Sequence, residues 1–102
     1  MRTLVEFNYT EEGLKALIRD GGSKRRELVA QLAETLGGKL EAWYLTYGKY
    51  DGIAIVEGEE VTGLAGILAL NASGLVKTQT TVLIDADKVD QAVKKVPAYP
   101  GK

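Results

Sequence analysis

A short connector in the middle of the chain limits the possible folds more than any other feature. The segment Tyr47–Asp51 contains a glycine and has the length of a β-hairpin loop. Residues 40–47 before it are rich in aromatic and β-favouring residues, and residues 53–56 after it form a short apolar run. The sequence therefore predicts two antiparallel strands joined by this connector.

One helical pattern precedes the predicted hairpin in the sequence, and another follows it. Residues 3–9 alternate between apolar and polar side chains, which is typical of a strand with one buried face. Residues 11–36 follow with a helical pattern that begins after Thr10, a capping residue, and is interrupted at Gly21–Gly22. Residues 58–73 form the second helical pattern.

A fourth strand and an additional helix complete the predicted chain. Residues 76–84 alternate again, and Pro97 ends a short helix that follows them. We expect one domain over residues 1–96 and a C-terminal tail over residues 97–102.

This order of elements predicts an α+β fold, a ferredoxin-like β-α-β-β-α-β sandwich with a short C-terminal helix. Two right-handed crossovers joined by a hairpin give a four-stranded antiparallel sheet with both main helices on one face. The helix predicted over residues 58–73 is apolar on more than one side, and such a helix usually packs against more than one neighbour. Its main apolar stripe consists of Val61, Leu64, Ala65, Leu68 and Ala72. Further apolar surface comes from Ile67, Ala69 and Leu70.

The face of the sheet away from the helices is also expected to carry large apolar side chains. In the second strand, Leu40, Ala42 and Tyr44 alternate with Trp43, Leu45 and Tyr47. A monomer in water would not normally leave such a patch exposed. We therefore expect two sheets to pair face to face, which makes the protein a homodimer or a higher homo-oligomer.

The composition excludes the commonest catalytic and metal-binding groups. The 102 residues include no cysteine and no histidine, so thiolate ligands, cysteine nucleophiles and the commonest general base are missing. The 13 basic and 14 acidic residues give a net charge of -1, which steers the protein to neither nucleic acid nor membrane. The N-terminus shows no signal-peptide pattern. We expect a cytoplasmic protein with no metal and no cofactor, and with neither nucleic acid nor membrane as a partner.

The hairpin is also the sharpest candidate site. Gly48 can adopt a positive φ, and Asp51 can accept hydrogen bonds from turn amides. The candidate ligand or interface residues are Tyr44, Tyr47, Gly48, Tyr50, Asp51 and Trp43. We assign none of them a catalytic role, because turn chemistry and aromatic packing explain the same residues without a ligand.

Four segments together match a known family pattern: residues 10–13, 32–39, 44–51 and 54–57. They resemble the GYD domain family of small uncharacterised proteins, and the likeness runs from about residue 3 to residue 84. The family's Gly-x-Tyr-Asp signature falls on Gly48, Tyr50 and Asp51. The resemblance implies a ferredoxin-like architecture of the dimeric α/β-barrel type and brings no established activity with it.

The chain also departs from related patterns. A similar hairpin occurs in the effector-binding half of feast/famine regulators, but this chain lacks the helix-turn-helix that those regulators carry. Gly52 follows the aspartate where a β-branched or apolar residue would be more usual. The C-terminal helix and tail after Asp87 fall outside the likeness.

Three functional hypotheses follow. The first is a non-catalytic binding or assembly domain, because the catalytic chemistry is missing and one sheet face is open. The second is a cofactor-independent enzyme of the monooxygenase or isomerase type, with a pocket between sheet and helices. Its pocket would be lined by Trp43, Tyr44, Tyr47, Asn8 and Asp51. The third is a sensor that holds a small molecule at a subunit interface near Gly48–Asp51.

A basic run, Lys24–Arg26, lies at the start of the second helical half of residues 11–36. We interpret it as a solvated first turn, with binding of a phosphate or an acidic partner as the alternative. Because basic charge at a helix N-terminus opposes the helix dipole, helix stability does not explain the run.

Overall fold

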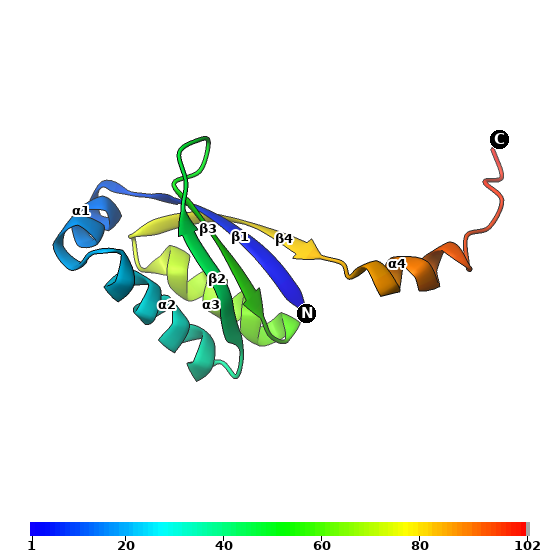
Figure 1. Cartoon of the computed structure of the whole chain (residues 1–102), viewed down its shortest axis with the longest axis horizontal. Coiled ribbons are helices and arrows are strands. Elements are labelled where there is room, and N and C mark those ends of the chain that lie inside the picture. Colours follow the sequence, from blue (N-terminus) through cyan, green and yellow to red (C-terminus); the bar gives the residue numbers. More distant parts are fainter. Residues whose placement is uncertain (102) are drawn as a thin grey trace.

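The computed structural model describes residues 1–101 and contains one four-stranded sheet with four helices (Figure 1). The elements in chain order are β1 (Arg2–Tyr9), α1 (Glu11–Asp20), α2 (Gly22–Thr35), β2 (Lys39–Leu45), β3 (Gly52–Glu57), α3 (Glu60–Ala72), β4 (Val76–Leu83) and α4 (Ala86–Val93). The sheet order is β2-β3-β1-β4, and every neighbouring pair is antiparallel. The predicted α+β, ferredoxin-like arrangement is confirmed.

Local sequence signals set the helix boundaries near the N-terminus. The Thr10 hydroxyl accepts a hydrogen bond from the Gly13 amide at 3.1 Å, which caps α1. Gly21 has a φ of 81° and separates α1 from α2, so the predicted break in the crossover lies at this glycine. Gly37, with a φ of 77°, follows α2 in the left-handed conformation that commonly ends a helix.

Alternation along the strands divides the sheet into two faces. Val5 and Phe7 of β1 and Ala54 of β3 are buried, and they point toward α2 and α3. We call this surface the helix-side face; α2 packs on it against β2, and α3 packs against β4. The opposite surface, which neither helix covers, we call the open face. The buried apolar core of residues 1–101 is small and adds only Ala16 to the three residues above.

Helix α3 has apolar side chains on all sides, and the structure selects one of them for the interior. Gly66, Ile67 and Leu70 turn toward the sheet, whereas Val61, Leu64 and Leu68 of the predicted stripe are exposed. The small Gly66 permits the close approach, because the Leu36 side chain lies 3.1 Å from the position of an added Cβ. The predicted stripe is therefore the outer surface of α3.

Helix α4 extends away from the sheet as an arm (Figure 1). Its apolar residues Val89 and Val93, and Val96 beyond it, are exposed. The radius of gyration is 16.6 Å, against about 13 Å for a compact chain of this length. No helix within residues 1–101 has the length and apolar character needed to cross a membrane.

Candidate functional site

Asp51 ties the hairpin to the end of β1. Its carboxylate accepts a hydrogen bond from the Tyr9 amide at 2.8 Å. Its own amide donates to the Phe7 carbonyl at 2.9 Å and to the Asn8 side-chain oxygen at 3.0 Å. These half-buried bonds give Asp51 a structural role. The carboxylate binds an amide of β1, and not a turn amide as the sequence predicted.

The two hairpin tyrosines lie in different surroundings. The Tyr50 hydroxyl donates to the Gln79 side-chain oxygen of β4 at 2.7 Å, so this side chain reaches across one end of the open face. The Lys49 ammonium lies 5.7 Å from the centre of the Tyr50 ring. Tyr47, by contrast, is fully exposed at the hairpin tip.

The constrained glycine of the hairpin is Gly52, and not Gly48. Gly48 does not have a positive φ, and a Cβ there would meet nothing within 4 Å, so the expected left-handed turn position is wrong. A Cβ on Gly52 would lie 2.3 Å from the Phe7 ring and 2.8 Å from the Tyr44 carbonyl oxygen. The glycine that departs from the usual pattern therefore makes room for the Phe7 ring.

Trp43 and Tyr44 are separated by the sheet itself. The Trp43 ring stacks on Phe7 of the helix-side face, with ring centres 6.0 Å apart. Tyr44 is 63% exposed and lies on the open face, opposite Ile53. The six candidate residues are thus distributed over both faces and the hairpin tip, and they do not converge on one site.

The open face has an apolar centre. The register places Leu4 beside Ile55, and Ile53 lies between Glu6 and Tyr44. Leu4, Ile53 and Ile55 are only half-buried. A hydrogen bond from Tyr50 borders this centre at one end, and a group of charged side chains borders it at the other.

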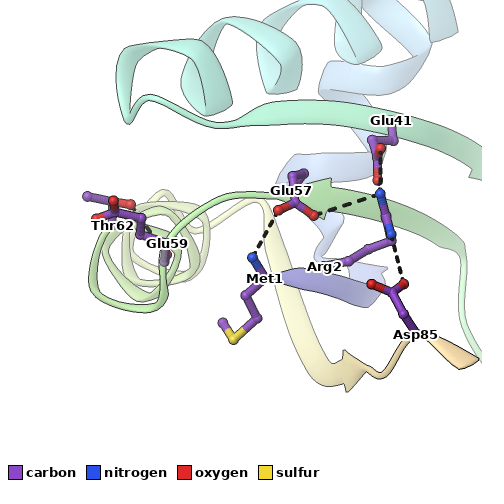
Figure 2. Close-up of polar contacts among 7 residues, drawn as sticks. All are labelled: Met1, Arg2, Glu41, Glu57, Glu59, Thr62 and Asp85. Atoms are coloured by element: carbon purple, nitrogen blue, oxygen red, sulfur yellow. Dashed lines mark hydrogen bonds and ion pairs between the residues drawn. The ribbon is translucent and has the colours of Figure 1, made fainter. Parts of the chain in front are cut away.

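Arg2 organises the charged end of the open face (Figure 2). Its guanidinium forms two hydrogen bonds with Glu41 and one with Asp85 at 3.2 Å, and it lies 3.9 Å from Glu57. The N-terminal ammonium pairs with Glu57 at 2.9 Å. Hydrogen bonding to Arg2 lowers the pKa of Glu41. These contacts join β1, β2 and β3 to the residue that precedes α4.

Two apolar cavities lie on the other side of the sheet, between the helix-side face and helices α2 and α3. The first has a volume of about 300 Å³ and includes Trp43 on its wall; we call it the Trp43 cavity. The second has a volume of about 350 Å³ and includes Leu36; we call it the Leu36 cavity. Of the six candidate residues, only Trp43 lines either of them.

Tyr9 and Arg25 are the two ionisable residues on the wall of the Trp43 cavity. The sequence analysis assigned Tyr9 to no site and considered Arg25 only within the basic run Lys24–Arg26. Arg25 belongs to the basic run at the start of α2, and its side chain is only 17% exposed. Tyr9 is the last aromatic residue of the β1 alternation. Burial raises the pKa of Tyr9, while the charge of Arg25 opposes the shift. The basic run was a sequence signal for Arg25. That Arg25 and Tyr9 lie on the same cavity wall can be seen only in the folded structure.

Asp20 lies next to Arg25 of the Trp43 cavity and accepts hydrogen bonds from two arginines. Arg19 donates to it at 2.9 and 3.1 Å, and Arg25 donates at 3.1 Å. Hydrogen bonds from Arg19 and Arg25, with the charges of both, lower the pKa of Asp20 to about 2. Two guanidinium groups share this carboxylate, and of the two only Arg25 lies on the wall of the Trp43 cavity.

Comparison with known families accounts for most of the chain. The GYD domain model matches residues 4–93 of the 102 residues. The chain belongs to the GYD domain family. In this GYD-domain protein the match continues through α4, so the expectation that the likeness ends before the C-terminal helix is wrong. No curated protein matches the sequence.

Proposed function

We propose that this GYD-domain protein is a non-catalytic assembly domain in which two copies pair their open faces. The observation that carries the proposal is the apolar centre of that face, around Leu4, Ile53 and Ile55. Neither α2 nor α3 covers this surface, and the α4 arm extends away from the sheet (Figure 1).

The layout of the open face supports a protein partner over a small molecule. Leu4, Ile53 and Ile55 form its apolar part, Glu6 lies beside Ile53, and the Arg2 group and the Tyr50–Gln79 bond are polar features at its two ends. An apolar centre with a polar rim is typical of protein interfaces. A second copy offers the same surface, and a two-fold axis lets a patch pair with itself.

The energy available from this pairing is substantial. Fully burying an isoleucine or leucine side chain contributes about 1.5–3 kcal/mol. Leu4, Ile53 and Ile55 are half-buried, so completing their burial in two copies contributes several kcal/mol. Tyr44 adds an exposed ring next to Ile53.

A cofactor-independent enzyme has less support. Of the five residues expected in its pocket, only Trp43 lines the Trp43 cavity, because Tyr44 lies on the opposite face. The raised pKa of Tyr9 keeps its hydroxyl protonated at neutral pH, which suits a hydrogen-bond donor and not a base. We therefore propose binding without catalysis.

Sensing of a small molecule at the hairpin tip also has less support than assembly. Tyr47 is exposed, and neither cavity includes Gly48, Tyr50 or Asp51 on its wall. The exposed ring of Tyr47 is better suited to a contact with the second copy at the edge of the paired sheets.

The test compares two isoleucine-to-lysine variants by sedimentation equilibrium at micromolar concentration. Ile55→Lys places a charge in the centre of the open face, whereas Ile18→Lys makes the same change in α1, where Ile18 is 79% exposed. We expect dimers for the wild type and Ile18→Lys, and monomers for Ile55→Lys. Circular dichroism checks that each variant is folded.

A third variant keeps the test decisive if Ile55→Lys does not fold. Tyr44→Glu changes an exposed side chain of the same face, so the core is undisturbed, and it should weaken dimerisation at least tenfold. A monomeric wild type would rule out the proposal, as would dissociation of Ile18→Lys to the same extent as Ile55→Lys.

A further inference from the structure

Two apolar cavities occupy the space between the sheet and helices α2 and α3, and we refer to them together as the channel. The Trp43 cavity and the Leu36 cavity share the wall residues Val29, Leu32 and Leu70, so they lie next to each other. Each volume, about 300 and about 350 Å³, is at the lower end of the range for small-molecule sites. Two adjoining cavities of this size favour an elongated ligand over a compact one.

The middle of the channel has an apolar wall, so the part of the ligand that lies there should be apolar. Its wall there consists of aliphatic side chains from α2 and α3 together with Phe7 and Ala54 of the sheet. A polar group placed there would lose its hydrogen bonds to water without replacement, which is costly. A hydrocarbon segment suffers no such loss and gains contacts with the wall.

The two ends of the channel differ in charge. At the Trp43 end, the one charged residue on the cavity wall is Arg25, which is nearly buried; the carboxylates of Asp20 and Asp51 lie outside this wall and each accept hydrogen bonds. The wall of the Leu36 cavity carries acidic residues instead: Glu57, Glu59 and Glu60. An anionic group is therefore attracted to the first end and repelled from the second, which sets the direction of a ligand.

Hydrogen-bonding capacity remains at the positive end. The Arg25 side chain makes one hydrogen bond within residues 1–101, from Nη1 to Asp20, although a guanidinium has five N–H donors. The Tyr9 hydroxyl makes no hydrogen bond with any of the residues that the structure describes, although it belongs to the same wall. These two side chains can donate to the oxygens of one carboxylate.

We propose that the channel binds a monocarboxylate with a linear apolar tail, in the manner of a medium-chain fatty acid. The carboxylate receives hydrogen bonds from Arg25 and Tyr9, and the tail extends past Leu32 and Leu70 toward the Leu36 cavity. This assignment gives a role to the basic run at the start of α2. It does not depend on the proposed assembly, because the channel lies within one copy of the chain.

The same charges argue against other head groups. A primary ammonium would face Arg25 at one end, and at the other it would meet only glutamates that are exposed or already paired with the N-terminus. A phosphate carries more than one negative charge near neutral pH, and the second charge would have to lie beside apolar wall residues. A carboxylate carries one negative charge, which the single guanidinium on this wall can pair with.

Trp43 provides a direct readout, since it is the only tryptophan in the chain and lies on the channel wall. The full-length protein is titrated with decanoate, decanol and decylamine, each below the concentration at which it aggregates, and Trp43 fluorescence is followed. We expect a saturable change with decanoate and at least tenfold weaker binding of decanol, which lacks the charge. Decylamine should bind more weakly than decanol. No saturable response to decanoate, or equal affinity for decylamine, would overturn the proposal.

Two neighbouring arginines provide matched variants. Arg25→Gln removes the guanidinium on the wall, whereas Arg26→Gln removes the same charge from an exposed residue that lines neither cavity. Arg25→Gln should weaken decanoate binding about tenfold and leave decanol binding unchanged. The variant should fold, because Asp20 keeps both hydrogen bonds from Arg19. Equal losses in the two variants would indicate general charge attraction and would contradict a built site.

Sedimentation of the same samples separates this inference from the proposed assembly. Decanoate binding by a monomeric wild type would support the channel while contradicting the sheet dimer. A dimeric wild type that does not respond to decanoate would support the dimer and contradict the channel.

Discussion

The two faces of the sheet both carry large apolar side chains, but the chain covers only one of them. On the helix-side face, Val5 and Phe7 are buried beneath α2 and α3. On the open face, Leu4 and Ile55 alternate with them along the same central strands and stay half-buried. The covered face therefore supplies most of the folding stability, and the open face has apolar surface left for association.

The covered face is itself incompletely filled. Its two cavities lie between the sheet and helices α2 and α3, whereas neither helix covers the open face. An apolar cavity suits a small molecule, and a broad surface suits a second sheet. This difference is why we propose occupants of different kinds for the two faces.

The largest expected effect concerns packing on the covered face. Gly52→Ala should lower the free energy of unfolding by about 2–4 kcal/mol, because the new methyl group would overlap the Phe7 ring. Gly48→Ala, four residues earlier, meets no atom within 4 Å and should change it by no more than about 0.5 kcal/mol. Urea unfolding followed by circular dichroism measures both.

Equal stability of the Gly52→Ala and Gly48→Ala variants would show that Phe7 is not held against the hairpin. The Gly52→Ala variant could instead unfold more easily and still dimerise with the wild-type affinity when folded. That outcome would show that the helix-side face, through Phe7, serves folding and that the open face serves association.

The order and type of the elements could be predicted because local signals determine them. The Thr10 cap and the interruption at Gly21 act within a few residues, so they can be seen in the sequence. The inward side of α3 could not be predicted, since the helix is apolar on all sides and only contact with Leu36 and the sheet selects Gly66. The exposure of α4 depends equally on tertiary contacts that the chain does not make.

The candidate site was predictable only in part. The hairpin position follows from turn chemistry, but the donor to the Asp51 carboxylate is the Tyr9 amide of β1, which no local signal around Asp51 indicates. Grouping Trp43 with Tyr44 in one pocket conflicts with strand geometry, because consecutive residues of a strand point to opposite faces. Tyr9 and Arg25 meet only after α2 packs over the sheet, so no spacing in the sequence reveals them.

A smaller effect is expected at Asp51, where the hairpin is attached to β1. Asp51→Ala leaves the half-buried Tyr9 amide without its partner and should lower the free energy of unfolding by about 1–3 kcal/mol. Asp51→Asn keeps a side-chain oxygen that can accept this hydrogen bond, so it should lower the free energy of unfolding by less than half as much as Asp51→Ala. Urea unfolding measures both variants.

Sedimentation and decanoate titration of these variants test whether the hairpin has a second role. If Asp51→Asn is stable but no longer dimerises or no longer binds decanoate, the hairpin contributes to that binding as well as to the stability of the fold. Unchanged binding in both measurements is the result expected from its hydrogen bonds.

The smallest effect is expected at the mouth of the channel, where the charged groups are near the surface and are screened by water. Folding lowers the pKa of Asp20 to about 2, from about 3.9 in an unfolded chain. A lowered pKa means that folding favours the charged form, so this contribution to stability is complete above about pH 4 and is lost as the pH falls toward 2. Asp20→Asn should therefore be less stable than the wild type at pH 6, and the difference should disappear near pH 2.

Asp90→Asn is the matched control, because Asp90 pairs with no cation in the described part of the chain and should show no such pH-dependent difference. The same Asp20 variant also tests the channel. Removing this carboxylate frees Arg25 from its competing anion, so decanoate should bind more tightly to Asp20→Asn than to the wild type at pH 6. Weaker binding of decanoate would mean that Asp20 holds the Arg25 guanidinium in position for the ligand. The Asp20 carboxylate would then be part of the binding site. An unchanged affinity would show that Asp20 does not compete with decanoate for Arg25, which would contradict the proposed contact between Arg25 and the carboxylate.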